Sequence, residues 1–317
     1  MKVVEHLARA KRPLISFEII PPLRGGTLQR LLELIEGLQR FEPPFIDITS
    51  HSAEAAYEEQ RDGTIVRRVR RKRPGTLGVC ALIQNKYRID TVPHVLCHGF
   101  TREETEDVLI EMRYLGIENV LAVRGDDPGF AKPVRADRSV NRYASELVEQ
   151  IVHMNHGKYL DEDLLDADPT SFCIGVGGYP EKHFEAPNLA TDILYTKKKV
   201  DAGAEYIVTQ MFFDNADYFS YVERCREAGI TVPIIPGLKI LTGRAHVTSL
   251  PRTFFISLPT ALVEEALAAD PKHVMDVGVE WAVRQTQGLL EHGVPAVHFY
   301  IMQSSEAITK VLDRLKL

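Results

Sequence analysis

The chain has few cysteines, and none of them are paired in a motif. Its four cysteines, Cys80, Cys97, Cys173 and Cys225, lie far apart, and no Cys-x-x-Cys pair is present. That spacing argues against a zinc site and against a disulfide framework. We therefore expect reduced, mostly buried thiols and no bound metal.

The sequence also lacks long apolar runs and an excess of basic residues. No stretch approaches the roughly 18 consecutive apolar residues of a membrane span, and the first residues lack the apolar core of a signal peptide. The formal net charge of −6 argues against general affinity for nucleic acids. These absences predict a cytoplasmic protein with neither a membrane nor a nucleic-acid partner.

Two common nucleotide-binding signatures are missing as well. No Gly-x-Gly-x-x-Gly motif follows a predicted strand, and there is no Walker loop. The glycine-rich stretch 175–178 precedes Tyr179-Pro180 instead of opening a helix. A nucleotide cofactor, if one binds, is expected at strand ends and not at a Rossmann turn.

What the sequence contains is a regular alternation of strand and helix patterns. Its 317 residues are 44% hydrophobic and 26% charged, which is typical of a soluble enzyme. The stretch 77–83 resembles a strand, but the next strand follows too closely for a parallel crossover, so we predict a helix at 76–87. Strands are predicted at residues 14–20, 45–49, 89–97, 119–123, 172–177, 206–211, 233–236 and 296–301. Helices are predicted at residues 27–40, 76–87, 102–115, 143–154, 189–202, 216–228, within 244–291, and at 305–315.

Eight strand–helix units in one chain favour a closed barrel over an open sheet. Four glycines lie just past predicted helices, where a left-handed residue often ends a helix: Gly116, Gly203, Gly229 and Gly293. The predicted fold is α/β, an eight-stranded parallel (βα)8 TIM barrel, and residues 1–317 are expected to form a single domain.

Glu18 is the most informative residue at a predicted strand end. It follows an apolar run, and Pro21-Pro22 stops that run because proline cannot continue a ladder. A buried carboxylate costs free energy unless it has a partner or a task. The carboxyl ends of barrel strands share one face, where active sites lie. The strand N-termini show no comparable polar set. The other residues predicted at the carboxyl ends of the strands are Thr49, His94, Arg124-Gly125-Asp126, residues 178–183, Gln210, Gly237 and Tyr300.

Two basic segments remain ambiguous. Residues 67–73 are predicted to lie in the loop after the second strand, where a plain surface loop is the favoured interpretation and a docking rim for anions is the alternative. Nucleic-acid binding is disfavoured because aromatic residues are not interleaved with the arginines. Residues 197–199 are three lysines that fan out around a predicted helix. His183 fits a cofactor contact or a structural hydrogen bond equally well.

Taken in order, the strand-end residues resemble methylenetetrahydrofolate reductases. The similarity extends over nearly the whole chain and matches the bacterial form, which consists of the catalytic barrel without the regulatory C-terminal domain of the larger eukaryotic enzymes. The matching motifs are Ser16-Phe17-Glu18 with Pro21-Pro22, Pro93-His94 with Cys97, Arg124-Gly125-Asp126, Tyr143-Ala144-Ser145, Tyr179-Pro180-Glu181 with His183, Lys199 to Ala204, and Thr209 to Phe213.

The resemblance implies a barrel flavoprotein of one-carbon and methionine metabolism that holds FAD. NADH or NADPH would reduce the flavin and leave, and 5,10-methylenetetrahydrofolate would then enter and be reduced to 5-methyltetrahydrofolate. The family's general acid falls on Glu18, and its aspartate near the pterin and flavin falls on Asp126. Gln210 matches a glutamine that contacts folate and nicotinamide in turn, and Thr49 joins these three residues in the implied substrate set. A homo-oligomer is also expected from the family.

The implied flavin set has twelve members, and this chain departs from the family pattern near it. Ser50 and His51 stand where an aromatic often follows the threonine, and Tyr195 replaces an asparagine. Arg244 and Ser304 stand where some members carry a phenylalanine and an arginine near the substrates. The flavin set is Thr49, His94, Arg124, Gly125, Asp126, Tyr143, Ala144, Tyr179, His183, Asp192, Lys198 and Lys199.

Two other functions stay open at this stage. One is a different barrel flavoprotein, such as a proline-dehydrogenase-like oxidase. The other is a non-catalytic barrel that binds folate or nucleotide within a complex. The first would turn its flavin over with proline and not with methylenetetrahydrofolate. The second would bind its ligand tightly without turnover. The choice between NADH and NADPH is also open, because no partner for a ribose 2′-phosphate is identifiable.

Overall fold

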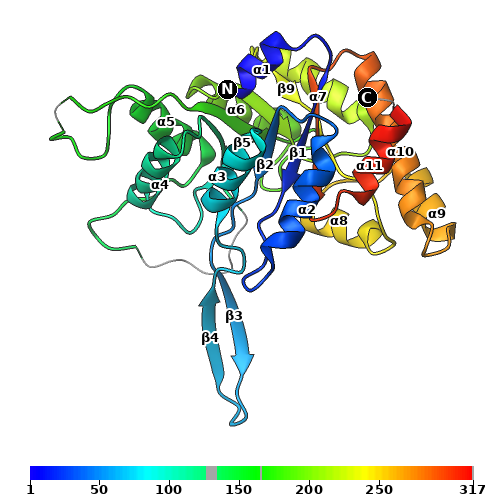
Figure 1. Cartoon of the computed structure of the whole chain (residues 1–317), viewed down its shortest axis with the longest axis horizontal. Coiled ribbons are helices and arrows are strands. Elements are labelled where there is room, and N and C mark those ends of the chain that lie inside the picture. Colours follow the sequence, from blue (N-terminus) through cyan, green and yellow to red (C-terminus); the bar gives the residue numbers. More distant parts are fainter. Residues whose placement is uncertain (126–133, 165, 316–317) are drawn as a thin grey trace.

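Nine parallel strands form one closed sheet in the computed structural model, which describes residues 1–125, 134–164 and 166–315 (Figure 1). The strand order is β10-β11-β1-β2-β5-β6-β7-β8-β9, and only Pro236 separates β9 from β10. The two ends of the order therefore meet, which confirms the predicted parallel barrel. The strands are β1 (Leu14–Ile19), β2 (Phe45–Ile48), β5 (Asp90–Leu96), β6 (Asn119–Val123), β7 (Cys173–Gly178), β8 (Tyr206–Thr209), β9 (Ile234–Ile235), β10 (Gly237–Leu238) and β11 (Ala296–Met302).

One predicted strand, 233–236, is divided in two. Pro236 has no N–H to donate to a ladder, so β9 pairs with β8 before it and β10 pairs with β11 after it. The carbonyl of Pro236 still accepts a hydrogen bond from the His298 amide at 2.9 Å. The proline thus turns the chain from one neighbouring strand to the other and closes the barrel.

Helices surround the barrel, and local signals set their ends. At the start of α4, Thr101 and Glu104 form a reciprocal capping box. Gly116, which follows α4, has a φ of +70°, and the other three glycines predicted to end helices also have positive φ. The helices are α1 (Val3–Arg9), α2 (Leu28–Gln39), α3 (Thr76–Tyr87), α4 (Arg102–Tyr114), α5 (Ala144–Asn155), α6 (Leu189–Asp201), α7 (Asn215–Glu227), α8 (His246–Phe254), α9 (Thr260–Ala268), α10 (Val274–Glu291) and α11 (Glu306–Leu315).

The core has two shells because successive strand residues point to opposite sides of the sheet. Ile46 and Ile48 of β2 pack in the cluster between sheet and helices, whereas Phe45 packs in a smaller cluster inside the barrel. Phe17 and Ile19 of β1 also belong to the outer cluster. This alternation turns the residues between them, Glu18 and Asp47, toward the barrel axis. All four cysteines are buried free thiols.

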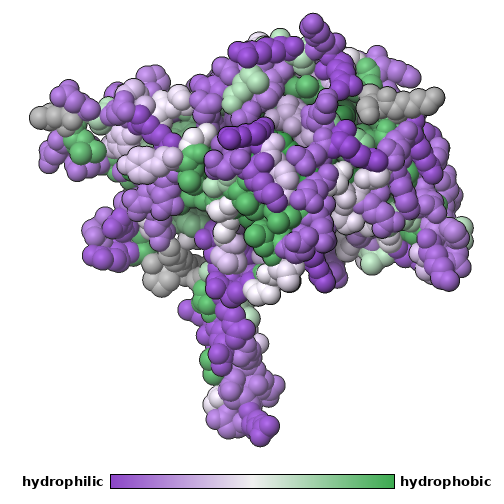
Figure 2. All heavy atoms as spheres, in the orientation of Figure 1, coloured by the Kyte–Doolittle hydropathy of each residue, from purple (hydrophilic) through white to green (hydrophobic). Residues whose placement is uncertain are grey.

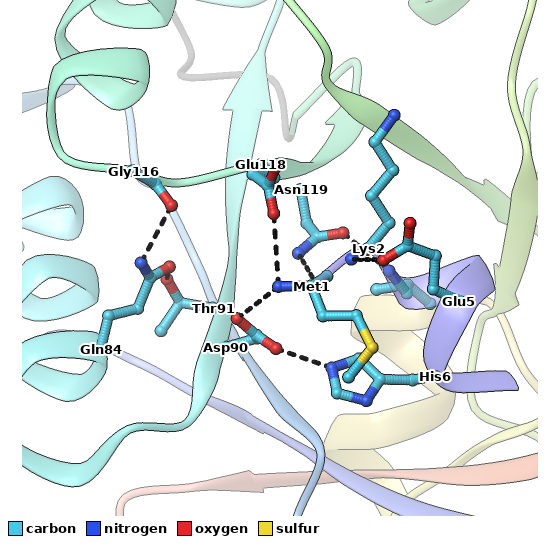
Figure 3. Close-up of polar contacts among 11 residues, drawn as sticks. Met1, Lys2, Glu5, His6, Gln84, Asp90, Thr91, Gly116, Glu118 and Asn119 are labelled. Carbon is cyan, nitrogen blue, oxygen red and sulfur yellow. Dashed lines mark hydrogen bonds and ion pairs between the residues drawn. The ribbon is translucent and has the colours of Figure 1, made fainter. Parts of the chain in front are cut away.

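The short helix α1, which the sequence analysis missed, covers the amino-terminal end of the barrel (Figure 3). Val3 of this helix is fully buried in the cluster inside the barrel, and its amide donates to Asn119 Oδ1 at 2.8 Å. His6 Nε2 lies 2.7 Å from Asp90 Oδ2. The strand N-termini are not free of polar residues, because Asp90 and Asn119 begin β5 and β6 and bind this helix.

A two-stranded antiparallel hairpin projects from the body, made of β3 (Glu54–Glu59) and β4 (Ile65–Arg70) (Figure 1). We call residues 54–70 the arm. The predicted loop at 67–73 is therefore wrong in part, because its first four residues belong to β4. Pairing with β3 and ion pairs to its side chains hold this segment as a strand. The run of arginines hid the strand pattern in the sequence. Among the described residues, no helix is long and apolar enough to cross a membrane.

Candidate active site

Three ionisable side chains from neighbouring strands meet at the carboxyl end of the barrel. Glu18 of β1 lies directly opposite Asp47 of β2 in the sheet register, and His94 comes from β5. His94 Nε2 is 3.4 Å from Glu18 Oε2 and 3.8 Å from Asp47 Oδ2. Residues 18, 47 and 94 thus form one cluster, although 76 positions separate the first from the last.

Glu18 is the group best suited to exchange a proton. It is 8% exposed, and this burial raises its pKa from 4.5 to about 7. His94 and Lys239 oppose the shift by favouring the carboxylate, whereas the nearby Asp47 adds to it. Because the resulting pKa of Glu18 is about 7, both of its protonation states are populated near neutral pH.

Asp47 makes the cluster unusual. It is fully buried, and within the described part of the chain neither of its carboxyl oxygens has a hydrogen-bond partner. Burial raises the pKa of Asp47 well above its ordinary value and lowers the pKa of His94. Two carboxyl groups this close do not readily ionise together. Burial therefore favours the neutral form of both Asp47 and His94.

A second set of contacts lies on the other side of β1, where Tyr300 of β11 is the register partner of Glu18. Lys239, just after β10, donates from Nζ to the Tyr300 carbonyl at 2.7 Å, and Tyr300 Oη donates to the Thr209 carbonyl at 2.6 Å. The amide of Gly237 donates to Thr209 Oγ1 at 2.9 Å. Burial lowers the pKa of Lys239 to about 8. These bonds tie β8, β10 and β11 together around the cluster.

Below the cluster, Ser16 Oγ and His298 Nδ1 share a hydrogen bond of 2.9 Å inside the barrel. Both residues are buried, and burial lowers the pKa of His298 to about 3. The imidazole is therefore neutral across the physiological range. This pair gives the site a rigid, uncharged floor.

Thr49 and His94 each have a buried polar atom that makes no hydrogen bond to another described residue, although His94 Nε2 faces the Glu18 carboxylate at 3.4 Å. The Thr49 amide donates to Ile19 and its carbonyl accepts from Thr76, so its backbone is held where β2 ends. Among the described residues, Thr49 Oγ1 and His94 Nε2 are buried without a hydrogen bond. Buried polar atoms of this kind usually have a partner, and a bound ligand can supply it.

The predicted flavin residues after β6 and β7 form a second group. Arg124 Nη1 is 2.5 Å from Glu185 Oε2, and His183 Nδ1 is 3.9 Å from the same oxygen. The Tyr179 and His183 rings meet edge to face with centroids 4.7 Å apart. Gly125 has a φ of +84°, a backbone conformation suited to glycine. Asp126 lies outside the described residues.

Residues of α6 predicted to bind the cofactor make contacts within the fold. Asp192 Oδ2 accepts from the His183 amide at 2.9 Å, which anchors the loop after β7. The Lys199 amine donates to the Gly177 carbonyl near the end of β7, and burial lowers the pKa of Lys199 to about 8. Lys198 is exposed, and its Nζ lies 5.6 Å from the centroid of the Tyr195 ring.

The remaining predicted residues are spread around the same face. Gln210 directly follows β8, its amide donates to the Gly178 carbonyl at 2.7 Å, and its side-chain oxygen accepts from Met211. Tyr143, which is 59% exposed, precedes α5, and Ala144 is the first residue of that helix.

The chain's departures from the family pattern also have defined surroundings. Arg71 donates to the His51 carbonyl at 2.7 Å and to Ser50 Oγ at 3.3 Å. Arg244 donates to the Ala269 carbonyl. Ser304 Oγ accepts from the Glu306 amide at 3.3 Å, just before α11. These contacts belong to the fold and do not depend on a ligand.

Sequence reasoning missed Asp47, Lys239 and His298 as members of the site. A signal was present for each, because one charged or polar residue interrupts an otherwise apolar strand or follows one directly. That signal does not say which side of the strand faces the barrel axis. The closed sheet answers that question.

Comparisons with known proteins agree over the whole chain. The family model for methylenetetrahydrofolate reductase matches residues 2–316. Methylenetetrahydrofolate reductase 1 of Schizosaccharomyces pombe is 30% identical over 305 residues, 95% of this chain and 46% of that protein. The 5,10-methylenetetrahydrofolate reductase of Salmonella typhimurium is 30% identical over 295 residues, 92% of this chain and 87% of that protein. The chain thus spans about half the length of several longer relatives.

A solved structure shares the fold. A protein of Clostridium thermocellum that binds two copies of 5-methyl-5,6,7,8-tetrahydrofolic acid superposes with a TM-score of 0.55 and 12% identity. The superposition covers 98% of this chain and 96% of that one. At that identity the likeness concerns the fold alone.

Proposed function

The chain belongs to the methylenetetrahydrofolate reductase family, as the resemblance of its motifs indicated, and we propose that it reduces 5,10-methylenetetrahydrofolate to 5-methyltetrahydrofolate with FAD and NADH or NADPH. The observation that carries this proposal is Glu18. It is a buried acid at the carboxyl end of a closed barrel, its pKa is raised to about 7, and His94 lies 3.4 Å away. A general acid that works near neutral pH needs such an environment.

Glu18 in its protonated form donates to N10 of the substrate's five-membered ring. The N10–carbon bond breaks, the carbon remains on N5 as an iminium cation, and Glu18 is left as the carboxylate. Addition of a hydride to that carbon gives the methyl group. Asp126 matches the family aspartate whose negative charge can stabilise the cation, and Gln210 matches the glutamine that contacts folate and nicotinamide in turn. The neutral pair of Ser16 and His298 adds no competing charge beneath Glu18.

The residues at this face suit a flavin dinucleotide. Thr49 Oγ1 is a buried polar atom without a hydrogen bond in the described part of the chain, so a ligand could supply one, and Gly125 allows close approach of its backbone. Arg124, which is paired with Glu185 in this structure, and Lys198, which is exposed on α6, would supply positive charge for a pyrophosphate. Bound here, FAD would accept hydride from the nicotinamide and supply it to the folate. Tyr179 and His183, which pack edge to face, would provide ring contacts.

The first experiment tests the cofactor and the reaction in sequence. Purified protein, reconstituted with FAD if needed, is titrated anaerobically with NADH and with NADPH, and then with methylenetetrahydrofolate. We expect a flavin spectrum that one or both nicotinamides bleach and that the folate restores, with methyltetrahydrofolate as product. Protein that cannot take up FAD contradicts the proposal.

Two controls separate the alternative functions. Reduction of the flavin by proline, with no reoxidation by methylenetetrahydrofolate, would assign the chain to another class of barrel flavoprotein. Tight folate binding without any turnover would indicate a non-catalytic barrel. The relative rates with NADH and NADPH identify the preferred nicotinamide.

A further inference from the structure

Lys239 is a lysine on the inner side of the barrel rim. Hydrophilic side chains dominate the outer surface of the molecule on the face shown in Figure 2. Lys239 instead directly follows β10 and is half-buried. Its neighbours Leu238 and Ile240 both pack in the outer cluster, so the side chain between them turns toward the barrel axis. Removing an ammonium from water costs free energy, so Lys239 needs a compensating partner.

The described residues give the Lys239 amine one hydrogen bond and no ion pair. Its Nζ donates to the Tyr300 carbonyl at 2.7 Å. An ammonium carries three donors, so a structural tie between β10 and β11, which is the simpler explanation, uses only one of them. His246, at the start of α8, is no counter-ion, because burial and then the Lys239 charge lower its pKa. The charge of Lys239 is therefore not neutralised by direct contacts.

The carboxyl group coupled to this charge is that of Glu18. Tyr300, whose carbonyl holds the amine, is the register partner of Glu18 on the neighbouring strand. Burial raises the pKa of Glu18 to about 7 and lowers that of Lys239 to about 8, and beyond burial each charge favours the charged form of the other. Asp47 is not coupled to Lys239 in this way, since burial is the cause of its raised pKa. Lys239 thus acts on one of two neighbouring acids.

The other groups around Glu18 do not supply a lasting positive charge. Asp47 of β2 is itself an acid. Burial lowers the pKa of His94 on β5, and burial raises the pKa of the Tyr300 hydroxyl on β11 well above its ordinary value. Lys239 has a pKa of about 8, so it is mostly protonated at pH 7. Among the described groups that act on Glu18, Lys239 is therefore the one that stays a cation at neutral pH.

We propose that Lys239 is the counter-ion of Glu18 and stabilises the carboxylate that Glu18 becomes when its proton passes to N10 of the folate. The O–H bond of Glu18 breaks, the N10–H bond forms, and the electron pair of the O–H bond stays on the carboxylate. Lys239 keeps its own proton throughout, so it is a positioning residue that acts through Glu18. This role rests on the proposed function, whereas the coupling of the two charges does not.

The lack of a direct ion pair is what allows Glu18 to remain an acid. An opposite charge in close contact lowers a carboxyl pKa by one to three units, and Glu18 would then lose its proton below neutral pH. Lys239 forms no ion pair with Glu18 in the described structure, and it offsets only part of the effect of burial. Because its amine is already held by Tyr300, the charge needs no rearrangement when the carboxylate forms.

The first test measures this coupling without any substrate. Protein labelled with carbon-13 at its glutamate carboxyl groups is titrated by NMR, and the Glu18→Gln spectrum assigns the Glu18 signal. Lys239→Met keeps the length of the side chain and removes its charge, so it should raise the pKa of Glu18 by about one pH unit. Lys239→Arg keeps the charge and should leave the pKa of Glu18 close to its wild-type value.

Lys199→Met is the matched control in this titration alone, because Lys199 belongs to the predicted flavin set. Its amine is also half-buried, donates to the Gly177 carbonyl near the end of a strand, and has a pKa that burial lowers to about 8. Beyond burial, its charge acts on Asp192 and not on Glu18. The pKa of Glu18 in Lys199→Met should therefore equal that of the wild type.

A reciprocal measurement keeps the test decisive if Lys239→Met does not fold, which circular dichroism and thermal unfolding establish. Coupling between two charges is mutual, so Glu18→Gln should lower the pKa of the Lys239 amine by about one pH unit as well. Carbon-13 at the lysine Cε atoms reports that pKa, and Lys239→Arg assigns the signal. A Lys239 pKa that Glu18→Gln leaves unchanged overturns the proposal.

The second test follows the reaction. Stopped-flow measurement gives the rate at which methylenetetrahydrofolate oxidises the reduced flavin, as a function of pH. In the wild type this rate should fall above about pH 7, where Glu18 loses its proton. In Lys239→Met the fall should move up by about one pH unit, and the rate on the acid side should drop about threefold, because a weaker acid donates its proton more slowly.

A purely structural role for Lys239 predicts a different result, namely a lower rate at every pH with no movement of the fall. That result overturns the proposal, as does an unchanged pKa of Glu18 in Lys239→Met. An equal rise of that pKa in Lys239→Arg or in Lys199→Met overturns it too. Wild-type flavin that the folate never oxidises removes the proposed function and the role within it, whereas a failed NMR titration removes the pairing alone. The two failures are therefore distinguishable.

Discussion

The two ends of the barrel each place a carboxylate beside a histidine, and the outcomes are opposite. At the amino-terminal end, Asp90 lies 2.7 Å from His6 Nε2 and 2.9 Å from the Met1 amino group (Figure 3). Burial pushes the pKa of Asp90 upward, but these hydrogen bonds outweigh it and the pKa is lowered. At the carboxyl end, burial dominates and the pKa of Glu18 rises to about 7.

The difference shows that hydrogen bonds to the charged form, and not the nearness of a histidine, decide the protonation state. Asp90 has two donors within 3 Å and a side chain that is 27% exposed. Glu18 has a histidine at 3.4 Å whose own pKa is lowered by burial, so little positive charge faces it. One end of the barrel therefore contributes stability and the other holds a transferable proton.

The largest expected effect is on the proposed reaction, which should depend on Glu18 and not on Asp90. Glu18→Gln should lower the rate of the proposed folate reduction about 10²–10⁴-fold, because the variant has no proton to donate. Reduction of the flavin by the nicotinamide should be retained. Asp90→Asn should leave both half-reactions unchanged. Stopped-flow measurement of each half-reaction checks this, and an equal loss in Asp90→Asn would remove the distinction between the two ends.

The second effect concerns stability and its dependence on pH. The folded-state pKa of Glu18 is raised above 4.5, so its contribution to stability is present below pH 4.5 and is lost as pH rises through about 7. Glutamine does not ionise. The unfolding free energy of Glu18→Gln relative to wild type should therefore increase by about 3 kcal/mol between pH 4.5 and pH 8.

Urea unfolding at several pH values measures that difference. A pH-independent difference would mean that Glu18 keeps an ordinary pKa in the folded protein. It would also remove the physical basis for a general acid at this position.

The smallest effect lies at the amino-terminal end. Asp90→Asn should lower the unfolding free energy by about 1–2 kcal/mol at pH 7, because it removes charged hydrogen bonds to His6 and to the amino group. The pKa of Asp90 is lowered in the folded state, so this loss should disappear as pH falls below its ordinary value of 3.8. Glu118→Gln, which breaks an exposed ion pair 3.3 Å long, is the matched control. It should change stability by less than about 1 kcal/mol.

Much of the barrel was predictable because burial on both faces leaves near-continuous apolar runs, and glycines end the helices between them. The parts that were missed carry weaker patterns. The arm's second strand is half arginine, which obscured its β-branched residues, and α1 has only seven residues. The strand 233–236 was found, but its division at Pro236 depends on which strands lie to either side.

The sequence by itself determined where the strands end and that an acid, Glu18, stands at the first of these ends, since periodicity and proline act locally. Only the tertiary structure decided what surrounds that acid. Asp47 and His94 reach it because β2 and β5 lie beside β1 in the sheet, and Ser16 reaches His298 across 282 positions because β1 pairs with β11. A pKa depends on distances through space and on exclusion of water. Both are properties of the folded barrel, and no local stretch of sequence contains them.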